Sequence, residues 1–346
     1  MDKVNLRALS SNEIKEFVSE LGLPDYRAGQ ILRWIYVKSA SRIDEMTDLS
    51  KDLRLRLDEL SYLSSLELIE TRVSRDGTKK FLFGLEDGNK VESVLIPDED
   101  RLTLCISSQV GCALACRFCL TGRMGLKRNL RAFEIIEQVI SARRLSPESQ
   151  ITNIVLMGMG EPLMNFTEVI EALFRLTELM HFPTRKITLS TAGIVPKILK
   201  LSETAPHVNL AVSLNATTDK VRDFIMPVNR KYPIKALIGA CRSYSLQKRR
   251  RITFEYVLLD GINNKEDDAK RLVRLIKGIP SKVNLIPFNE YDGCEFKRPS
   301  DESTLKFQDI LISSGLTALI RKSKGKDIMA ACGQLSVIGS KNSGII

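Results

Sequence analysis

From residue 102 onward, the sequence alternates between short β-rich runs and longer amphipathic runs. LTLCISS precedes the helical pattern AFEIIEQVISARRL, and ITNIVLMGMGEP precedes the helical pattern FTEVIEALFRLTELM. Four more β-rich runs follow, with helical stretches between them: KITLSTAGI, HVNLAVSLNA, RITFEYVLLDGI and KVNLIPFN. This alternation predicts an α/β fold in which helices cover a parallel sheet. Six such units predict a partial (β/α)6 barrel over residues 101–300, because a closed barrel needs eight units.

A smaller helical part precedes this core. Ser10-Ser11-Asn12-Glu13 is a capping box that begins one helical pattern. Residues 26–38 form a second helical pattern, and the spacing of Leu53, Leu57 and Leu60 indicates a third. We therefore interpret residues 1–64 as an N-terminal helical domain whose basic face binds RNA.

The remaining parts flank the core on either side. Residues 65–100 carry the hairpin signals Asp76-Gly77 and Asp87-Gly88 between β-rich runs, which predicts a β meander. Residues 301–346 form a C-terminal segment that contains the isolated Cys332 in the run DIMAACGQL.

The charge and the cysteine content limit where such a chain works. Its 346 residues carry a formal net charge of +10, which would attract polyanions such as RNA, although a basic surface can also serve solubility alone. The N-terminal run lacks the apolar region of a secretory signal, and no apolar run reaches the length of about 18 residues that a membrane span needs. We expect a cytoplasmic protein whose seven cysteines are reduced, and therefore suited to metal binding or catalysis.

Three of these cysteines lie close together in the run GCALACRFCLTG. Cys112, Cys116 and Cys119 have the spacing C-x3-C-x2-C. Three thiolates can ligate three irons of an iron–sulfur cube and leave the fourth iron open. A structural zinc site would need a fourth ligand, and the only histidines, His181 and His207, show no paired ligand spacing. The loop is bounded by glycines and lacks an apolar period, which argues against ordinary core cysteines.

The other polar motifs lie at the ends of the expected strands. GMGEP, STAG, SLNA and IPFN each follow a β-rich run, as the triple cysteine does. In parallel α/β sheets, function gathers in the loops that leave the carboxyl ends of the strands. We therefore expect all five motifs to meet at one edge of the sheet.

Together these motifs resemble a known family. CISSQVGCALACRFCLTG, MGMGEP, KITLSTAG, SLNA, VNLIPFN and DIMAACGQL, in this order, resemble the RlmN/Cfr family of adenine methyltransferases within the radical S-adenosylmethionine (SAM) superfamily. The resemblance extends along nearly the whole chain. It implies one 4Fe–4S cluster held by Cys112, Cys116 and Cys119, whose open iron binds SAM, and a 5′-deoxyadenosyl radical made by one-electron cleavage of SAM.

The resemblance also implies which side chains contact SAM. The matching positions are Gly160, Glu161, Ser190, Ser213, Leu214, Asn215 and Asn289. Without the resemblance, Glu161 would be part of a strand-end turn, and the serines would be ordinary strand-end residues. The family often has SLHA where this chain has SLNA, so a titrating side chain at Asn215 is not expected.

Three further residues acquire catalytic roles by resemblance. Cys332 would take a methyl group from SAM and carry it to the adenine, and Cys105 would release the product by a transient disulfide with Cys332. Glu92 matches the proposed proton acceptor, but whether Glu92 or Cys105 takes the ring proton stays open. Cys241 and Cys294 match no functional motif, and we interpret them as structural.

The implied substrate is carbon 2 of an adenosine in the peptidyl-transferase centre of 23S rRNA and of the adenosine beside the anticodon in some tRNAs. Pro162 and the run QVGCALAC favour this branch over the Cfr branch, which methylates carbon 8. Phosphate binding is expected from the basic N-terminal helices and from the arginines after Cys119, namely Arg123, Arg128 and Arg131. The expected state is a monomer served by an electron donor such as flavodoxin and its reductase. A zinc-stabilised RNA-binding protein without catalysis is the alternative from another class.

Overall fold

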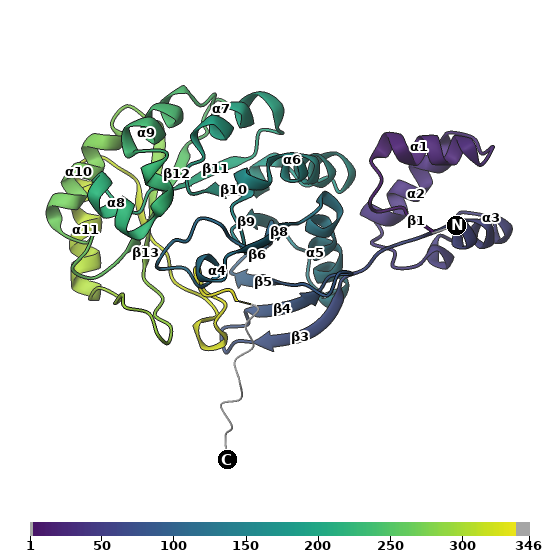
Figure 1. The fold of residues 1–346 in the computed structure, drawn as a ribbon, viewed down its shortest axis with the longest axis horizontal. Coiled ribbons are helices and arrows are strands. Elements are labelled where there is room, and N and C mark those ends of the chain that lie inside the picture. The colour runs from purple at the N-terminus through teal and green to yellow at the C-terminus, as the bar shows by residue number, and fades with distance from the viewer. Residues whose placement is uncertain (1–2, 337–346) are drawn as a thin grey trace, which may run out of the picture.

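The computed structural model describes residues 3–336. Its N-terminal lobe contains three helices that stand to one side of the core in Figure 1. They are α1 (Ser11–Glu20), α2 (Tyr26–Tyr36) and α3 (Lys51–Leu60), with a 3-10 turn η1 (Ile43–Glu45) between the last two. The capping box at Ser10 forms as predicted, since its hydroxyl accepts from the Glu13 amide and the Glu13 carboxylate accepts from the Ser10 amide. A short parallel pair, β1 (Val4–Asn5) with β2 (Ser61–Tyr62), joins the two ends of the lobe.

One ten-stranded sheet forms the centre of the molecule. Its order is β14-β13-β12-β11-β10-β9-β6-β5-β4-β3, and the strands from β6 to β14 run parallel. The parallel strands are β6 (Arg101–Cys105), β9 (Asn153–Leu156), β10 (Ile187–Thr191), β11 (Asn209–Ser213), β12 (Ile252–Leu258), β13 (Ser281–Pro287) and β14 (Ala318–Ile320). The open order confirms the partial barrel.

Helices pack on the outside of the parallel strands (Figure 1). They are α5 (Ala132–Leu145), α6 (Phe166–Phe174), α7 (Val195–Thr204), α8 (Asp219–Ile225), α9 (Ile234–Ser243), α10 (Glu266–Ile276) and α11 (Asp301–Ser313). A π-helical turn η3 (Arg175–Leu179) extends α6, and short 3-10 turns are η2 (Pro162–Asn165), η4 (Thr184–Lys186), η5 (Pro227–Arg230) and η6 (Lys326–Ile328). Each helix presents an apolar face to the sheet, for example Ile198 and Leu201 of α7, both buried.

The predicted meander is continuous with the core sheet. Strands β3 (Glu67–Val73), β4 (Lys79–Gly84) and β5 (Lys90–Asp98) are antiparallel, and β5 pairs with β6. The two predicted hairpin turns lie where Asp76-Gly77 and Asp87-Gly88 indicated. Strand β6 is therefore the seam at which an antiparallel sheet becomes a parallel one, and it carries Cys105.

The C-terminal segment holds an element that the sequence did not predict. Strand β14 adds a seventh parallel strand beside β13, with Ala318 opposite Val283. Three residues are too few to show a period, which explains the omission. The division of the chain into four parts at residues 64, 100 and 300 stays a prediction.

Candidate functional site

The strand-end motifs meet at one cavity of about 160 Å³ at the carboxyl edge of the parallel strands. Its wall is shared by the cysteine loop, the ends of β9 to β13 and the segment after β14. The predicted site residues among its lining are Cys112, Cys116, Cys119, Gly160, Glu161, Ser190, Ser213, Asn215, Asn289 and Cys332. The structure thus brings ten of the thirteen predicted side chains together, and leaves Cys105, Glu92 and Leu214 outside the lining.

The cysteine loop leaves and re-enters the molecule through a narrow antiparallel ribbon. Strand β7 (Gln109–Gly111) precedes the loop and β8 (Leu126–Asn129) follows the short helix α4 (Leu120–Arg123). Gly111 has a φ of +77°, and a Cβ there would lie 1.9 Å from the Gly125 carbonyl oxygen. Only glycine permits this approach, which lets the Cys112 amide donate to the Gly125 carbonyl at 2.9 Å. A backbone contact therefore joins the two ends of the cysteine loop.

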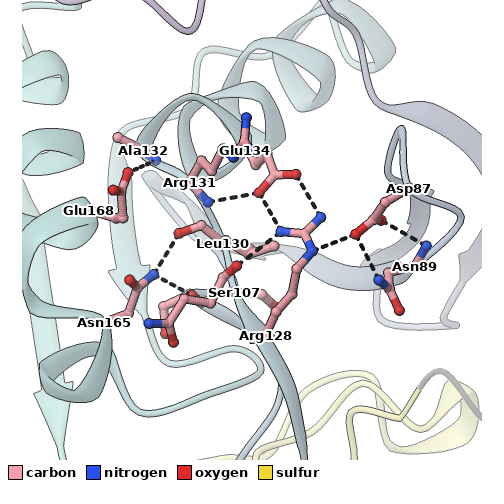
Figure 2. Close-up of polar contacts among 12 residues, drawn as sticks. Asp87, Asn89, Ser107, Arg128, Leu130, Arg131, Ala132, Glu134, Asn165 and Glu168 are labelled. Atoms are coloured by element: carbon pink, nitrogen blue, oxygen red, sulfur yellow. Dashed lines mark hydrogen bonds and ion pairs between the residues drawn. The ribbon is translucent and has the colours of Figure 1, made fainter.

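Arg128 of β8 anchors this ribbon to Glu134 and Asp87, whose contacts Figure 2 shows. Its guanidinium donates twice to the Glu134 carboxylate, at 2.8 Å each, and once to Asp87 at 2.5 Å. The Glu134 carboxylate also accepts from the Arg131 amide at the start of α5. These hydrogen bonds to two carboxylates hold Arg128 in the fold, and its phosphate contact stays a prediction.

The three loop thiols are suited to a cluster. Burial raises the pKa of all three, that of Cys112 to about 12, and the nearby thiols raise the pKa of Cys116 further. Three such thiols could ionise together only around a strongly positive centre, which iron provides. Among residues 3–336, no three His, Cys, Asp or Glu side chains are placed to share a single metal ion. A cube does not require that arrangement, since each thiolate takes a separate iron.

Gly160 and Glu161 shape the wall beside the cluster thiols. Gly160 has a φ of +101°, and a Cβ there would lie 2.6 Å from Cβ of Gln109. The buried Glu161 carboxylate accepts from the Thr191 hydroxyl at 2.6 Å and from the Ala192 amide at 2.7 Å. Burial raises the pKa of this carboxyl. Glu161 thus ties the GMGEP turn to the end of β10 while it lines the cavity.

Two buried oxygens that accept no hydrogen bond show where a polar ligand fits. Within the described residues, Asn289 Oδ1 and Glu255 Oε1 are buried and lack a hydrogen-bond partner. Both residues line the cavity, and the Ser190 hydroxyl donates to the other Glu255 oxygen at 3.3 Å. Buried acceptors without donors are costly, so a ligand with ammonium or hydroxyl groups is favoured there. SAM carries both kinds of group.

Asn215 and Leu214 differ from the simple expectation for SLNA. Asn215 has a left-handed backbone with a φ of +55°, and its Oδ1 accepts from the Val257 amide at 2.8 Å. Its side chain therefore links the end of β11 to β12 and also lines the cavity. The Leu214 side chain is fully buried, and its carbonyl accepts from Arg222 Nε at 2.9 Å.

Three charged residues at the site were missed from the sequence. Arg222 is fully buried and donates to the Leu214, Ala192 and Ser213 carbonyls, which holds two strand ends together. Arg321 Nη1 lies 3.9 Å from Glu255 Oε1. A negative charge at Cys332 would raise the pKa of Arg321. Arg222 shares the inward face of α8 with Ile225, a spacing that could have revealed its burial.

Cys332 is an exposed residue that lines the cavity together with the loop thiols. Cys105 is buried on β6, where burial first and the Cys332 charge second raise its pKa to about 12. Glu92 lies on β5, where Lys80 Nζ contacts one carboxylate oxygen at 3.0 Å and the Ser336 amide donates to the other at 2.8 Å. Burial raises the pKa of Glu92 and Lys80 opposes that shift.

Comparison with known proteins agrees with this site. Residues 4–63 match the model of the ribosomal RNA large subunit methyltransferase N-terminal domain, and residues 106–273 match that of the radical SAM superfamily. The dual-specificity RNA methyltransferase RlmN of Geotalea uraniireducens is 53% identical over 337 residues, which cover 97% of each chain. The chain belongs to the RlmN family. The RlmN of Geobacter sulfurreducens is also 53% identical, over 96% of this chain and 92% of that one.

A solved structure extends the RlmN match to three dimensions. A radical SAM methyltransferase from Sphaerobacter thermophilus superposes with a TM-score of 0.92 at 45% identity, over 96% of this chain and 99% of that one. As a radical SAM protein of the RlmN family, the chain uses a 4Fe–4S cluster and SAM, which the three thiols and the open acceptors fit. No helix within residues 3–336 is long and apolar enough to cross a membrane.

Proposed function

We propose that this protein is a SAM-dependent RNA methyltransferase that methylates carbon 2 of an adenosine in 23S rRNA and in some tRNAs. One observation carries the proposal: Cys332 lines the same cavity as the three loop thiols, although more than 200 residues separate them. A cluster-binding protein without catalysis has no use for that fourth thiol. The RlmN relatives are dual-specificity RNA methyltransferases, which supports action on two kinds of RNA.

Different residues of the cavity would hold the cluster, orient SAM and carry the methyl group. Cys112, Cys116 and Cys119 would hold the cluster, which when bound supplies the electron that makes a 5′-deoxyadenosyl radical from SAM. Asn289, Glu255 and Ser190 offer acceptors and a hydroxyl that orient SAM in the cavity. Cys332 would attack the methyl group of one SAM as a thiolate, the nucleophilic form of cysteine.

Product release falls to Cys105 and Glu92. The Cys105 thiol would form a transient disulfide with Cys332 as the bond between Cys332 and the RNA methylene breaks. Burial keeps Cys105 protonated at neutral pH, so a base must assist it. Glu92 is a candidate on the adjacent strand β5; burial raises its pKa, and its ion pair with Lys80 opposes that shift. The two alternatives for the ring proton stay open.

The direct test is nucleoside analysis of RNA from a deletion strain that carries this chain. We expect 2-methyladenosine in 23S rRNA and in tRNA, and none with Cys332→Ala. Methylation at carbon 8 would assign the protein to the Cfr type, and full activity of Cys332→Ala would refute the carrier role.

The bound metal distinguishes this proposal from the alternative, a zinc-stabilised RNA-binding protein without catalysis. Protein loaded with iron and sulfide without oxygen should be brown, whereas the alternative predicts a colourless protein. RNA binding should weaken steeply with salt, because phosphate contacts release counterions. An electron donor of the flavodoxin type and a monomeric state belong to the same proposal.

A further inference from the structure

The segment that follows β14, residues 321–336, has little regular structure of its own. Within it only the single turn η6 (Lys326–Ile328) is helical, and Gly325 and Met329 on its two sides have left-handed backbones with φ of 63° and 55°. Figure 1 shows this yellow segment beside the meander strands. The place of Cys332 must therefore be set by tertiary contacts.

One set of these contacts joins the segment to the hairpin turn between β3 and β4, and each side donates to the other. The Asp327 carboxylate accepts from the Ser74 hydroxyl at 2.5 Å and from the Arg75 amide at 3.2 Å. In return, the Asp76 carboxylate of the turn accepts from the Gly325 amide at 2.9 Å. Each side thus supplies a carboxylate that satisfies backbone or hydroxyl donors of the other.

A second set of contacts extends this interface toward the cavity. Lys80 Nζ on β4 donates to the Met329 carbonyl at 3.1 Å while it pairs with Glu92. The Ser336 amide donates to the other oxygen of the same Glu92 carboxylate, the one that does not contact Lys80. Cys332 lies between these two attachment points. The residue directly after Cys332 also contacts the cysteine loop: the Leu120 amide at the end of that loop donates to the Gly333 carbonyl at 2.8 Å.

We propose that the β3–β4 hairpin turn is a docking platform for residues 321–336, and that Asp327 is the positioning residue that fixes Cys332 in the cavity. The proposal rests on the carrier role of Cys332 proposed above. A carrier sulfur must meet a methyl donor, a nucleobase and a second thiol in turn. Because the segment is held on both sides of Cys332, the sulfur stays close to its reaction partners. A larger fraction of the radicals that form should therefore lead to methylated RNA.

Hydrogen exchange tests the docking without reference to catalysis. Asp327 is exposed, so Asp327→Ala leaves the core intact, and Asp309→Ala, an exposed aspartate on α11, is the matched control. In the anaerobic holoenzyme, we expect the Gly325 and Ala330 amides to exchange about tenfold faster in Asp327→Ala and unchanged in the control. Equal exchange in wild type and Asp327→Ala would overturn the docking. Ser74→Ala removes the same hydroxyl contact from the other side and should act likewise.

A product ratio tests the positioning. The ratio of methylated adenosine to 5′-deoxyadenosine should fall at least threefold in Asp327→Ala, because radicals form but miss a misplaced carrier. A merely destabilised protein would lose both products in proportion, and that unchanged ratio would refute the positioning role. Failure of the carrier role has a different signature, namely product from Cys332→Ala, and it would leave the exchange result intact.

Discussion

At the scale of single residues, the two thiols of the proposed disulfide have opposite surroundings. Cys332 is exposed on an irregular segment, whereas Cys105 is buried on the seam strand β6. The exposed thiol can approach different partners, and the buried one can only receive it. This asymmetry fits an accessible carrier and a buried acceptor.

Replacing the fixed partner should stop the reaction at its covalent stage. With Cys105→Ala, we expect the joined protein–RNA species to accumulate, because no second sulfur can displace the Cys332–methylene bond. Denaturing gel electrophoresis with labelled RNA would show it as a slow band. Cys241→Ala, a change at another buried cysteine, should give free methylated RNA. A free, unlinked Cys105→Ala protein after turnover would contradict the resolving role.

The sequence was informative about residues whose chemistry depends on local spacing. The three loop thiols and the strand-end motifs could be placed at one edge, and the structure gathers them there. Arg222 could have been suspected from its spacing with Ile225, whereas nothing near Glu255 and Arg321 in the sequence indicated that they lie close together. The ion pair of these two residues joins positions that are far apart in the chain.

At the scale of elements, the cysteine loop depends on its ribbon. Strands β7 and β8 are too short to be stable by themselves, and Arg128 joins them to α5 and to the Asp87 turn. The boundaries of α5 coincide with the predicted pattern, because its capping carboxylate Glu134 lies three residues after Arg131. The same carboxylate serves the helix and the loop.

Loss of this anchor should loosen the cluster. For Arg128→Gln, we expect a loss of about 1–3 kcal/mol in the free energy of unfolding, because the Glu134 and Asp87 carboxylates lose their charged donor. The iron content after anaerobic reconstitution should fall to less than half of wild type. Lys127→Gln, a neighbouring exposed change, is the control. Normal iron content in Arg128→Gln would show that the ribbon holds without this anchor.

At the scale of the whole molecule, the N-terminal lobe is attached by buried polar contacts. Arg7 pairs with Glu137 of α5 at 3.6 Å, and the Ser64 hydroxyl donates to the same carboxylate. Arg175 donates to the Arg7 carbonyl at 2.7 Å and to the Tyr36 hydroxyl at 3.2 Å. The sequence predicted the lobe from its helical periods, but nothing in it indicated which core residues would hold it.

This attachment should make stability depend on pH. Burial raises the pKa of Glu137 to about 7 in the folded protein, from 4.5 in an ordinary setting. The folded state therefore keeps a proton that the unfolded chain loses between these values, and the free energy of unfolding falls as pH rises from 4.5 to 7. Glu137→Gln removes this fall.

Urea unfolding of cluster-free wild type and Glu137→Gln at pH 5 and pH 8 would measure the effect. The variant should gain on the order of 2–3 kcal/mol relative to wild type between the two conditions. Glu134→Gln tests whether any acidic residue of α5 would do the same, and we expect no such gain. An equal pH response of wild type and Glu137→Gln would show that this carboxyl is ionised in both states.

The contacts between the Ser74 turn and Asp327 also have a consequence for biosynthesis. They join residues 253 positions apart, so the last wall of the cavity cannot form until nearly the whole polypeptide has left the ribosome. The three loop cysteines emerge much earlier. The order of synthesis therefore places the cysteine loop before the segment that completes the cavity wall.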